Sequence, residues 1–318
     1  MRLAHLHLPH RISYTHSLRL QSSLLGQHFA YKDALRAAAT QPTSATHSPP
    51  DPTVLTFSTD PTYTVGRRHL QSNPISASQQ SFLTDGHAAE FYASPRGGLL
   101  TYHGPGQLTA YPIIDLRRHG ITPRCYIRLL EKTVMRTCAR FGVLNTTTTS
   151  DPGVWISDAS TGRPTDRKIC AIGVQVSRGI TTHGIGLNVL DEEIAPGDVE
   201  TYHFTDSKSD PHRGMNHDGS LHSVSGSGSG SSQKGYLTWG FGRIVACGLE
   251  GKEVTWLSRE GAGADVRVHH VAEAFVEEFM RSLNKESNKG KDTDRGIVSQ
   301  VYRVNEADVL ATDTSHGT

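Results

Sequence analysis

The chain has 318 residues and a formal net charge of +1, from 32 basic and 31 acidic side chains. This balance gives no support for nucleic-acid binding, because phosphate recognition needs a clustered basic excess. No run of about 18 apolar residues is present, so no membrane span is predicted. Hydrophobic residues make up only 36% of the chain, which indicates a core diluted by polar insertions.

The N-terminal region allows two interpretations. The first acidic residue is Asp33, and the stretch before it contains Arg2, Arg11 and Arg19 together with several serines. An acid-poor start of this kind is typical of a mitochondrial transit peptide. The alternative is that residues 14–25 form the first amphipathic helix of the domain, and composition alone leaves both open.

We predict one catalytic domain over residues 1–284, interrupted by loop insertions near residues 40–53, 71–80 and 205–234. The first is rich in Pro, Ser and Thr, the second is polar, and the third contains the low-complexity run "SVSGSGSGSS". Residues 285–318 are charged and polar, and we expect a solvated C-terminal tail there.

The segments between the insertions predict a mixed α/β (α+β) architecture. A strand is expected at Val54–Thr59, and another at Leu108–Leu116, where Pro112 indicates an edge or a bulge. Helices are expected from Thr122 to Gly142, with a Thr cap and Pro in the first turn, and near residues 268–283. Three further strands lie at residues 153–157, 169–177 and 184–189. Consecutive strands with few long helices argue against a doubly wound sheet.

Four cysteines lie far apart without a Cys-x-x-Cys pair, which argues against a structural zinc site, and we expect no metal. A chain of this length can fold without disulfides, so free thiols in a reducing compartment are predicted. The cysteines are Cys125, Cys138, Cys170 and Cys247.

Dense glycines surround one histidine in "RGGLLTYHGPGQL", residues 96–108. Thr109 stands where a dinucleotide-binding fingerprint needs its third Gly or Ala, and no Gly-Lys-Ser/Thr loop occurs in the sequence. The glycines predict either a loop that a ligand approaches closely or a pair of tight turns. His103 is correspondingly either an active or a structural histidine.

Two further segments contain groups suited to catalysis. Lys168 begins the apolar run "KICAIGVQVS", where burial favours a neutral amine that can act as a base, although lysines at strand edges also guard against aggregation. His183 is followed by two glycines in "HGIG". Cys247 ends an apolar run just before Gly248, a reachable position, yet most buried cysteines act as small hydrophobes. A nearby amine would activate the thiol.

In order, these segments resemble those of the octanoyltransferases, also called lipoyl(octanoyl) transferases, of the fungal, mitochondrial type. The resemblance covers most of the chain from about residue 3 to residue 283, outside the insertions. It implies a mixed β-sheet with flanking helices, similar to the catalytic fold of biotin protein ligases and lipoate ligases. The segments are "PTYTVGRR", "RGGLLTYHGPGQLTAYPIIDL", "DPGVWI", "KICAIGVQVSRGITTHGIGLNV" and "FGRIVACGLEGKEVTWL".

The resemblance also implies an activity and a site. An octanoyl or lipoyl group would move from acyl carrier protein to a lysine of a lipoyl domain, with Cys247 as the thioester-forming nucleophile and Lys168 as its partner. No cofactor is implied. The implied acyl-binding residues are Arg96, Gly97, Gly98, Leu99, Leu100, Thr101, Tyr102, His103, Ala171, Ile172, Gly173, Gly184, Ile185 and Gly186.

The expected partners are octanoyl-acyl carrier protein as donor, and lipoyl domains of 2-oxoacid dehydrogenase complexes or the glycine cleavage H protein as acceptors. The resemblance favours a mitochondrial location. Two alternatives stay open. An ATP-dependent lipoate or biotin protein ligase would need no cysteine, and a non-catalytic protein would bind acyl carrier or lipoyl domains without transferring the acyl group.

Overall fold

The structure, a computed structural model, describes residues 1–40, 48–158, 160–161, 164–203, 235–244, 253–287 and 296–311. The predicted insertion at 205–234 and the candidate nucleophile Cys247 lie outside the described residues.

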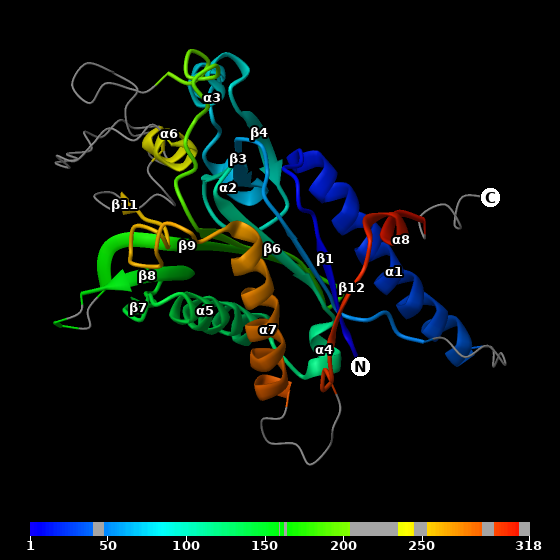
Figure 1. Ribbon diagram of the computed structural model, residues 1–318. Coiled ribbons are helices and arrows are strands. Elements are labelled where there is room, and N and C mark those ends of the chain that lie inside the picture. Colours follow the sequence, from blue (N-terminus) through cyan, green and yellow to red (C-terminus); the bar gives the residue numbers. More distant parts are fainter. Residues whose placement is uncertain are drawn as a thin grey trace.

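A mixed β-sheet forms the centre of the fold (Figure 1). Its strand order is β12-β1-β2-β6-β10-β9-β8-β7, and β11 pairs with β9 beside this path. β1 runs parallel to both of its neighbours, whereas β6, β8, β9 and β10 pair in antiparallel fashion. The mixed sheet predicted from the sequence is therefore confirmed. The strands are β1 (Leu3–His7), β2 (Thr53–Phe57), β6 (Gln107–Ile113), β7 (Thr146–Thr147), β8 (Gly153–Ser157), β9 (Pro164–Ser177), β10 (Ile180–Asn188), β11 (Glu253–Val254) and β12 (Val301–Arg303).

Helices cover both faces of this sheet, because its strands alternate between two hydrophobic cores. On β6, Leu108 and Ala110 belong to the core under α5 (Pro123–Arg140) and α7 (Val268–Ser287). Tyr111 and Ile113 belong to the core under α1 (Tyr14–Thr40). Figure 1 shows α5 and α7 side by side, with α1 on the other side of the sheet. The short helices α4 (Leu116–His119) and α8 (Glu306–Ala311) lie at the periphery.

The two long predicted helices are confirmed, and their ends follow local chemistry. The Thr122 side chain accepts a hydrogen bond from the Cys125 backbone N–H, and Pro123 is the first helical residue of α5. α7 buries Val271 and Phe275 on one face, as their spacing predicts.

A second, three-stranded sheet lies against one part of the main sheet and has its own core. Its order is β4 (Glu90–Ser94), β3 (Thr62–Gly66) and β5 (Thr101–His103). Tyr63 and Tyr102 from these strands pack with Trp239 of α6 (Tyr236–Gly242). The connection between β4 and β5, which contains Gly97 and Gly98, lies over the main sheet, where the Gly97 N–H bonds the Val174 carbonyl.

The 71–80 stretch is largely helical, which corrects its prediction as a loop insertion. α2 (Arg67–Ser72) ends inside it and α3 (Ala77–Thr84) begins inside it, followed by the 3-10 helix η1 (Asp85–His87). Ser76 and Gln79 form a capping box in which each side chain bonds the other's backbone N–H. The Ser-x-x-Gln spacing was the signal in the sequence.

The predicted C-terminal tail is in its described part a component of the domain. α7 continues to Ser287, and β12 adds a parallel strand to the main sheet, with Val301 opposite Leu3. α8 packs on α1, where the Ser23 hydroxyl donates to the Val309 carbonyl at 2.7 Å. A domain boundary at residue 284 is therefore wrong.

The N-terminal residues also belong to the fold. β1 is an internal strand of the main sheet, and α1 begins at Tyr14 and buries Leu20 and Leu24. α1 contains residues 14–25, which the second interpretation of the sequence assigned to the first helix of the domain. None of the helices among the described residues combines the length and apolar character that a bilayer crossing demands.

Pro112 lies in a central strand, which corrects the expectation of an edge. β6 has β2 on one side and β10 on the other, but its ladder with β10 ends at Ala110. Beyond that point the Thr181 hydroxyl donates to the Pro112 carbonyl at 2.7 Å. The missing N–H of proline therefore costs this ladder no hydrogen bond.

Candidate functional site

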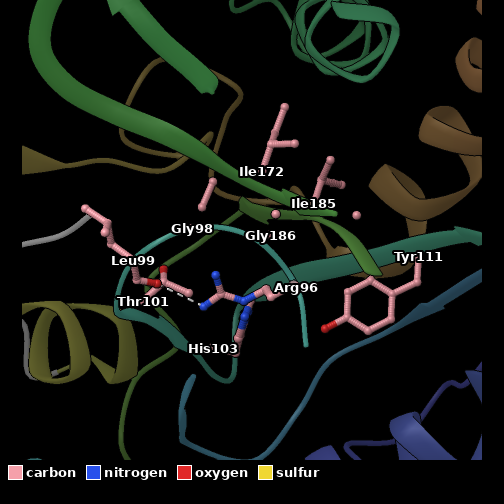
Figure 2. Close-up of a pocket in the computed structure, with 12 residues that line it drawn as sticks. Arg96, Gly98, Leu99, Thr101, His103, Tyr111, Ile172, Ile185 and Gly186 are labelled. Carbon is pink, nitrogen blue, oxygen red and sulfur yellow. Dashed lines mark hydrogen bonds between the residues drawn. The ribbon is translucent and has the colours of Figure 1, made fainter. Parts of the chain in front are cut away.

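A pocket lies between the main sheet and the connection from β4 to β5 (Figure 2). Its floor comes from the centres of β9 and β10, and its cover comes from the glycine-rich stretch after β4. It is lined by Arg96, Gly98, Leu99, Thr101, His103, Tyr111, Ala171, Ile172, Gly173, Gly184, Ile185 and Gly186. The sequence-predicted acyl-binding segments thus meet in one cavity.

The floor of the pocket has small residues because other groups approach the backbone closely. A Cβ on Gly173 would lie 2.9 Å from the Arg96 side chain and 2.9 Å from the Gly97 carbonyl oxygen. A Cβ on Gly186 would lie 2.9 Å from Oε1 of Gln107. Both distances are too short for real contacts. The Gly97 carbonyl is backbone and cannot move aside, so the pocket requires glycine at position 173, whereas a side chain at position 186 would displace the Gln107 amide.

Arg96 holds the cover in place. Its guanidinium is buried and donates to the carbonyl oxygens of Thr64, Gly97 and Leu99 at 2.7, 3.0 and 3.2 Å. The bond to Leu99 is drawn in Figure 2. The backbone N–H of Gly97 in turn donates to the carbonyl of Val174 on β9 at 3.1 Å. Arg96 therefore lines the pocket, and its hydrogen bonds fix the conformation of the loop that covers it.

Three of the predicted acyl-binding residues do not line the pocket. Leu100 and Tyr102 point into the core of the smaller sheet, because they alternate with Thr101 and His103 along β5. Gly97 contributes its backbone to the attachment on β9.

His103 is held by a hydrogen bond within the pocket wall. Its Nδ1 and Oε1 of Gln107 are 2.7 Å apart. Burial, and after it the charge of Arg96, lowers the pKa of His103 to about 4. The ring of Tyr14 from α1 lies nearly parallel to the imidazole, with 6.5 Å between centroids. The imidazole is therefore neutral at pH 7.

His183 lies next to the pocket in a strained conformation. Its φ of 58° is in the left-handed region, which is uncommon for a residue other than glycine. The Gln21 side chain accepts its backbone N–H at 2.7 Å, and Ser94 Oγ lies 3.3 Å from its Nε2. Burial lowers the pKa of His183 to about 3. Gln21 of α1 and Ser94 of β4 both bond His183, so the fold maintains its strained backbone conformation.

A β-bulge turns Lys168 toward the pocket face of β9. Val154 pairs with Cys170, but the next residue, Trp155, pairs with Lys168, so Ile169 is an extra residue in the ladder. Paired residues share a face, and Gly153 pairs with Ala171 of the pocket floor. Lys168 and Ala171 therefore face the same side, which a regular strand would not allow for residues three apart.

The surroundings of Lys168 are closely packed. The residue is 4% exposed, its Nζ lies 5.0 Å from the centroid of the Trp155 ring, and its Cε lies 2.5 Å from where a Cβ on Gly153 would be. On the other side of β9, Val254 of β11 pairs with Lys168, and the Thr255 N–H donates to the Lys168 carbonyl at 2.9 Å. The structure thus places Lys168 beside the pocket floor.

The sequence prediction missed Tyr111 and Gln107. Tyr111 lines the pocket, and Gln107 bonds His103. Both lie on β6 at odd positions, which face the pocket, whereas Leu108 and Ala110 face the core under α5 and α7. The period of two along the predicted strand was the available signal. Across the described ranges, no three His, Cys, Asp or Glu side chains are grouped so that they could hold a metal ion.

Comparison with known proteins places the chain in a family. The model of the lipoyl protein ligase A/B catalytic domain matches residues 27–192, more than half of the chain. An octanoyl-[acyl-carrier-protein]:protein N-octanoyltransferase of Danio rerio, called LIPT2 and mitochondrial, is 32% identical over 276 residues, which are 86% of this chain and 91% of that protein.

Relatives from other groups carry related names. A probable octanoyltransferase of Schizosaccharomyces pombe is 36% identical over 56% of this chain and 70% of its own length. An octanoyltransferase of Flavobacterium psychrophilum is 31% identical over 69% of this chain and 72% of its own length.

Solved structures of low identity also align. A bi-partite lipoate protein ligase from Thermoplasma acidophilum matches with a TM-score of 0.49 and 12% identity, covering 98% of this chain and 90% of that one. The biotin protein ligase of Aquifex aeolicus with biotin and ATP matches with a TM-score of 0.40 and 12% identity, covering 91% of this chain and 72% of that one.

The match to the family model and the zebrafish relative, aligned along nearly its full length, agree with the order of motifs in the sequence. The chain therefore belongs to the lipoyl protein ligase A/B catalytic domain family, and within it to the octanoyltransferases, acyltransferases that act in protein lipoylation.

Proposed function

We propose that this chain moves an octanoyl group from octanoyl-acyl carrier protein to a lysine of a lipoyl domain through a thioester on Cys247. The observation that carries the proposal is the bulge at Ile169, which directs Lys168 to the face of β9 that forms the pocket floor. A base beside an acyl pocket is the arrangement that this chemistry needs.

The pocket suits an acyl chain. Gly98, Leu99 and Ala171 give part of its lining a small or apolar surface. The side chains of Ile172 and Ile185 point to the opposite face of the sheet, into the core under α5 and α7. Apolar lining with few polar groups is typical of sites for small apolar ligands.

Cys247 lies outside the described residues, and its role rests on the sequence and on its neighbours in the chain. It precedes Val254 by seven residues, and Val254 pairs with Lys168. The chain leaving the cysteine therefore reaches the strand of the proposed base within a few residues. This short separation along the chain between Cys247 and the residue paired with Lys168 supports the proposed pairing of the thiol with the amine.

Each of the two steps of the reaction includes a proton transfer through Lys168. Lys168 removes the proton from the Cys247 thiol, and the thiolate attacks the donor thioester. The proton passes to the departing carrier thiol, and the octanoyl group stays on Cys247 as a thioester. In the second step the amine of the acceptor lysine attacks this thioester, gives up one proton through Lys168, and leaves an amide and the free Cys247 thiol.

The partners follow from the same proposal. The donor is octanoyl-acyl carrier protein, and the acceptors are lipoyl domains of 2-oxoacid dehydrogenase complexes or the glycine cleavage H protein. The zebrafish relative, named mitochondrial, supports a mitochondrial location, which a fluorescent fusion of the full-length protein would test.

Intact-protein mass spectrometry tests the covalent step. Incubation with octanoyl-acyl carrier protein without ATP should add one octanoyl group to the wild type. Addition of a lipoyl domain should then move that mass to the domain. The Cys247→Ala variant should gain no mass, whereas Cys125→Ala, which changes an exposed cysteine at the start of α5, should behave as wild type. Transfer by Cys247→Ala at the wild-type rate would overturn the proposal.

A further inference from the structure

A line of hydrogen bonds leads from the pocket to the strand of Lys168. His103 Nδ1 and Gln107 Oε1 are 2.7 Å apart, and Gln107 Nε2 lies 2.9 Å from Asn188 Oδ1. Asn188 Nδ2 donates to the Thr255 carbonyl at 2.9 Å, and the Thr255 N–H donates to the Lys168 carbonyl at 2.9 Å. All five residues are buried, so these bonds have no competition from solvent.

The direction of each bond follows from two backbone carbonyls, which can only accept. The Thr255 carbonyl requires the amide nitrogen of Asn188, so the Asn188 oxygen faces Gln107. The Tyr102 carbonyl, 3.3 Å from Gln107 Nε2, requires the amide nitrogen of Gln107 on the same side. The oxygen of Gln107 therefore faces His103, and Nδ1 of His103 must carry the proton.

We infer that Gln107 is a positioning residue that fixes His103 as the Nδ1–H tautomer, so that the unprotonated Nε2 accepts an N–H of the incoming lysine amine in the pocket. This inference rests on the proposed amine transfer. It assigns to Gln107 a role in the second step of the reaction.

Nε2 is suited to this role. His103 lines the pocket, and within the described part of the chain no hydrogen bond joins its Nε2 to another residue. The imidazole is neutral at pH 7, because burial and the charge of Arg96 lower its pKa to about 4. A neutral ring with Nδ1 protonated has one acceptor, and that acceptor is Nε2.

The incoming amine needs such an acceptor. It attacks as a neutral group, and an acceptor on one N–H aims its lone pair at the thioester carbonyl. The charged side chain that lines the pocket, Arg96, has only donors and a positive charge. That charge disfavours an ammonium ion nearby and so favours the neutral amine that reacts.

The first test is spectroscopic and uses the wild-type protein. The ¹⁵N spectrum of histidine-labelled protein, with the His103 signals identified by their loss in His103→Gln, should show the Nδ1–H tautomer. Gln107→Met removes the acceptor and should release His103 to a mixture of tautomers. Gln107→Glu keeps an acceptor oxygen and should keep Nδ1–H. A wild-type spectrum with Nε2–H at His103 would overturn the inference whether or not the Gln107 variants fold.

The second test separates the two half-reactions. Loading of Cys247 should be nearly unchanged in Gln107→Met, while transfer from the loaded enzyme to the lipoyl domain should fall by about a hundredfold, the cost of a misplaced reactant. The transfer rate of Gln107→Glu should fall by a smaller factor. Thr137→Val, which removes a buried hydroxyl bonded to the Thr133 carbonyl on α5, is the control for a lost hydrogen bond far from the pocket.

The outcomes distinguish this inference from the proposed function. If the wild type loads no octanoyl group, the proposed function fails, and the tautomer of His103 is still measured independently. If the wild type loads and transfers normally and Gln107→Met transfers at the same rate, the inference about Gln107 is wrong. An equal loss in both half-reactions, with unfolding at lower temperature, would show a structural role only.

Discussion

The amine of Lys168 lies 5.0 Å from the centroid of the Trp155 ring, and the two residues are opposite each other across β8 and β9. An aromatic face attracts a protonated amine and has less effect on a neutral one. The contact with Trp155 therefore helps to fix the position of the Lys168 amine. The bulge at Ile169 brings this pair to the pocket side of the sheet.

Replacement of Lys168 should remove the proposed base. We expect Lys168→Met to lower octanoyl transfer by about 10²- to 10⁴-fold, the usual contribution of a general base. Single-turnover kinetics with octanoyl-acyl carrier protein measures this loss. Lys132→Met changes an exposed lysine on α5 and should leave the rate as in wild type. A fully active Lys168→Met would exclude Lys168 as the base.

Gly173 should not tolerate a side chain. A Cβ there would meet the Gly97 carbonyl at 2.9 Å, and a backbone atom cannot move aside as a flexible side chain can. We expect Gly173→Ala to lose about 1–3 kcal/mol of stability, as overpacked cores do, and to weaken binding of the octanoyl donor. Urea unfolding and the KM for the donor measure the two effects. Gly197→Ala, where no atom lies within 4 Å of the added Cβ, is the control.

Stability should fall below neutral pH because of five buried histidines. Burial is the largest cause of their lowered pKa values, about 3 for His5 and His183 and about 4 for His28, His103 and His119. Their unfolded value is near 6.5, so between pH 6.5 and 4 the unfolded chain binds more protons than the folded one. The stabilisation is fully present above pH 6.5 and is lost as pH falls through this window.

Each such histidine contributes at most about 1.4 kcal/mol per pH unit in this range. Urea unfolding at pH 7.5 and 5.0 should show the loss, and His5→Asn should reduce the slope. His270→Asn, at an exposed position, should not change it. Equal stability at the two pH values would contradict the assignment of neutral buried histidines.

Removal of residues 296–318 should destabilise the whole domain. The truncation exposes one edge of β1 and takes away Val298 and Val309, which are 2% and 5% exposed. Burial of two aliphatic side chains of this size is worth on the order of 4 kcal/mol. Thermal unfolding compares this variant with a chain that ends at residue 311. If both unfold at the same temperature, β12 and α8 contribute nothing to stability.

The sequence predicted the elements whose signals are local. The cap at Thr122, the buried face of α7 and the apolar strand after Lys168 depend on residues close in the chain, and all were found. The capping box at Ser76 is equally local and was overlooked because the surrounding composition is polar. The family motifs supplied the pocket residues that propensity alone cannot select.

Long-range relationships could not be derived from the sequence. The pairing of β12 with β1 joins two strands that are about 300 residues apart in the sequence. The sequence of a short apolar strand does not indicate which other strand it pairs with. The bulge at Ile169 is visible only as a shift in register against β8. The orientation of Gln107 depends on the carbonyls of Tyr102 in β5 and of Thr255, the residue after β11.

The position of β12 beside β1 has a consequence for biogenesis. A ribosome makes Leu3 long before Val301, yet the two are neighbours in one parallel ladder. Until the final strand has emerged, β1 keeps an unpaired edge that other extended chains could join. The main sheet is therefore completed only after β12 has been made, and such non-local closure makes folding slow.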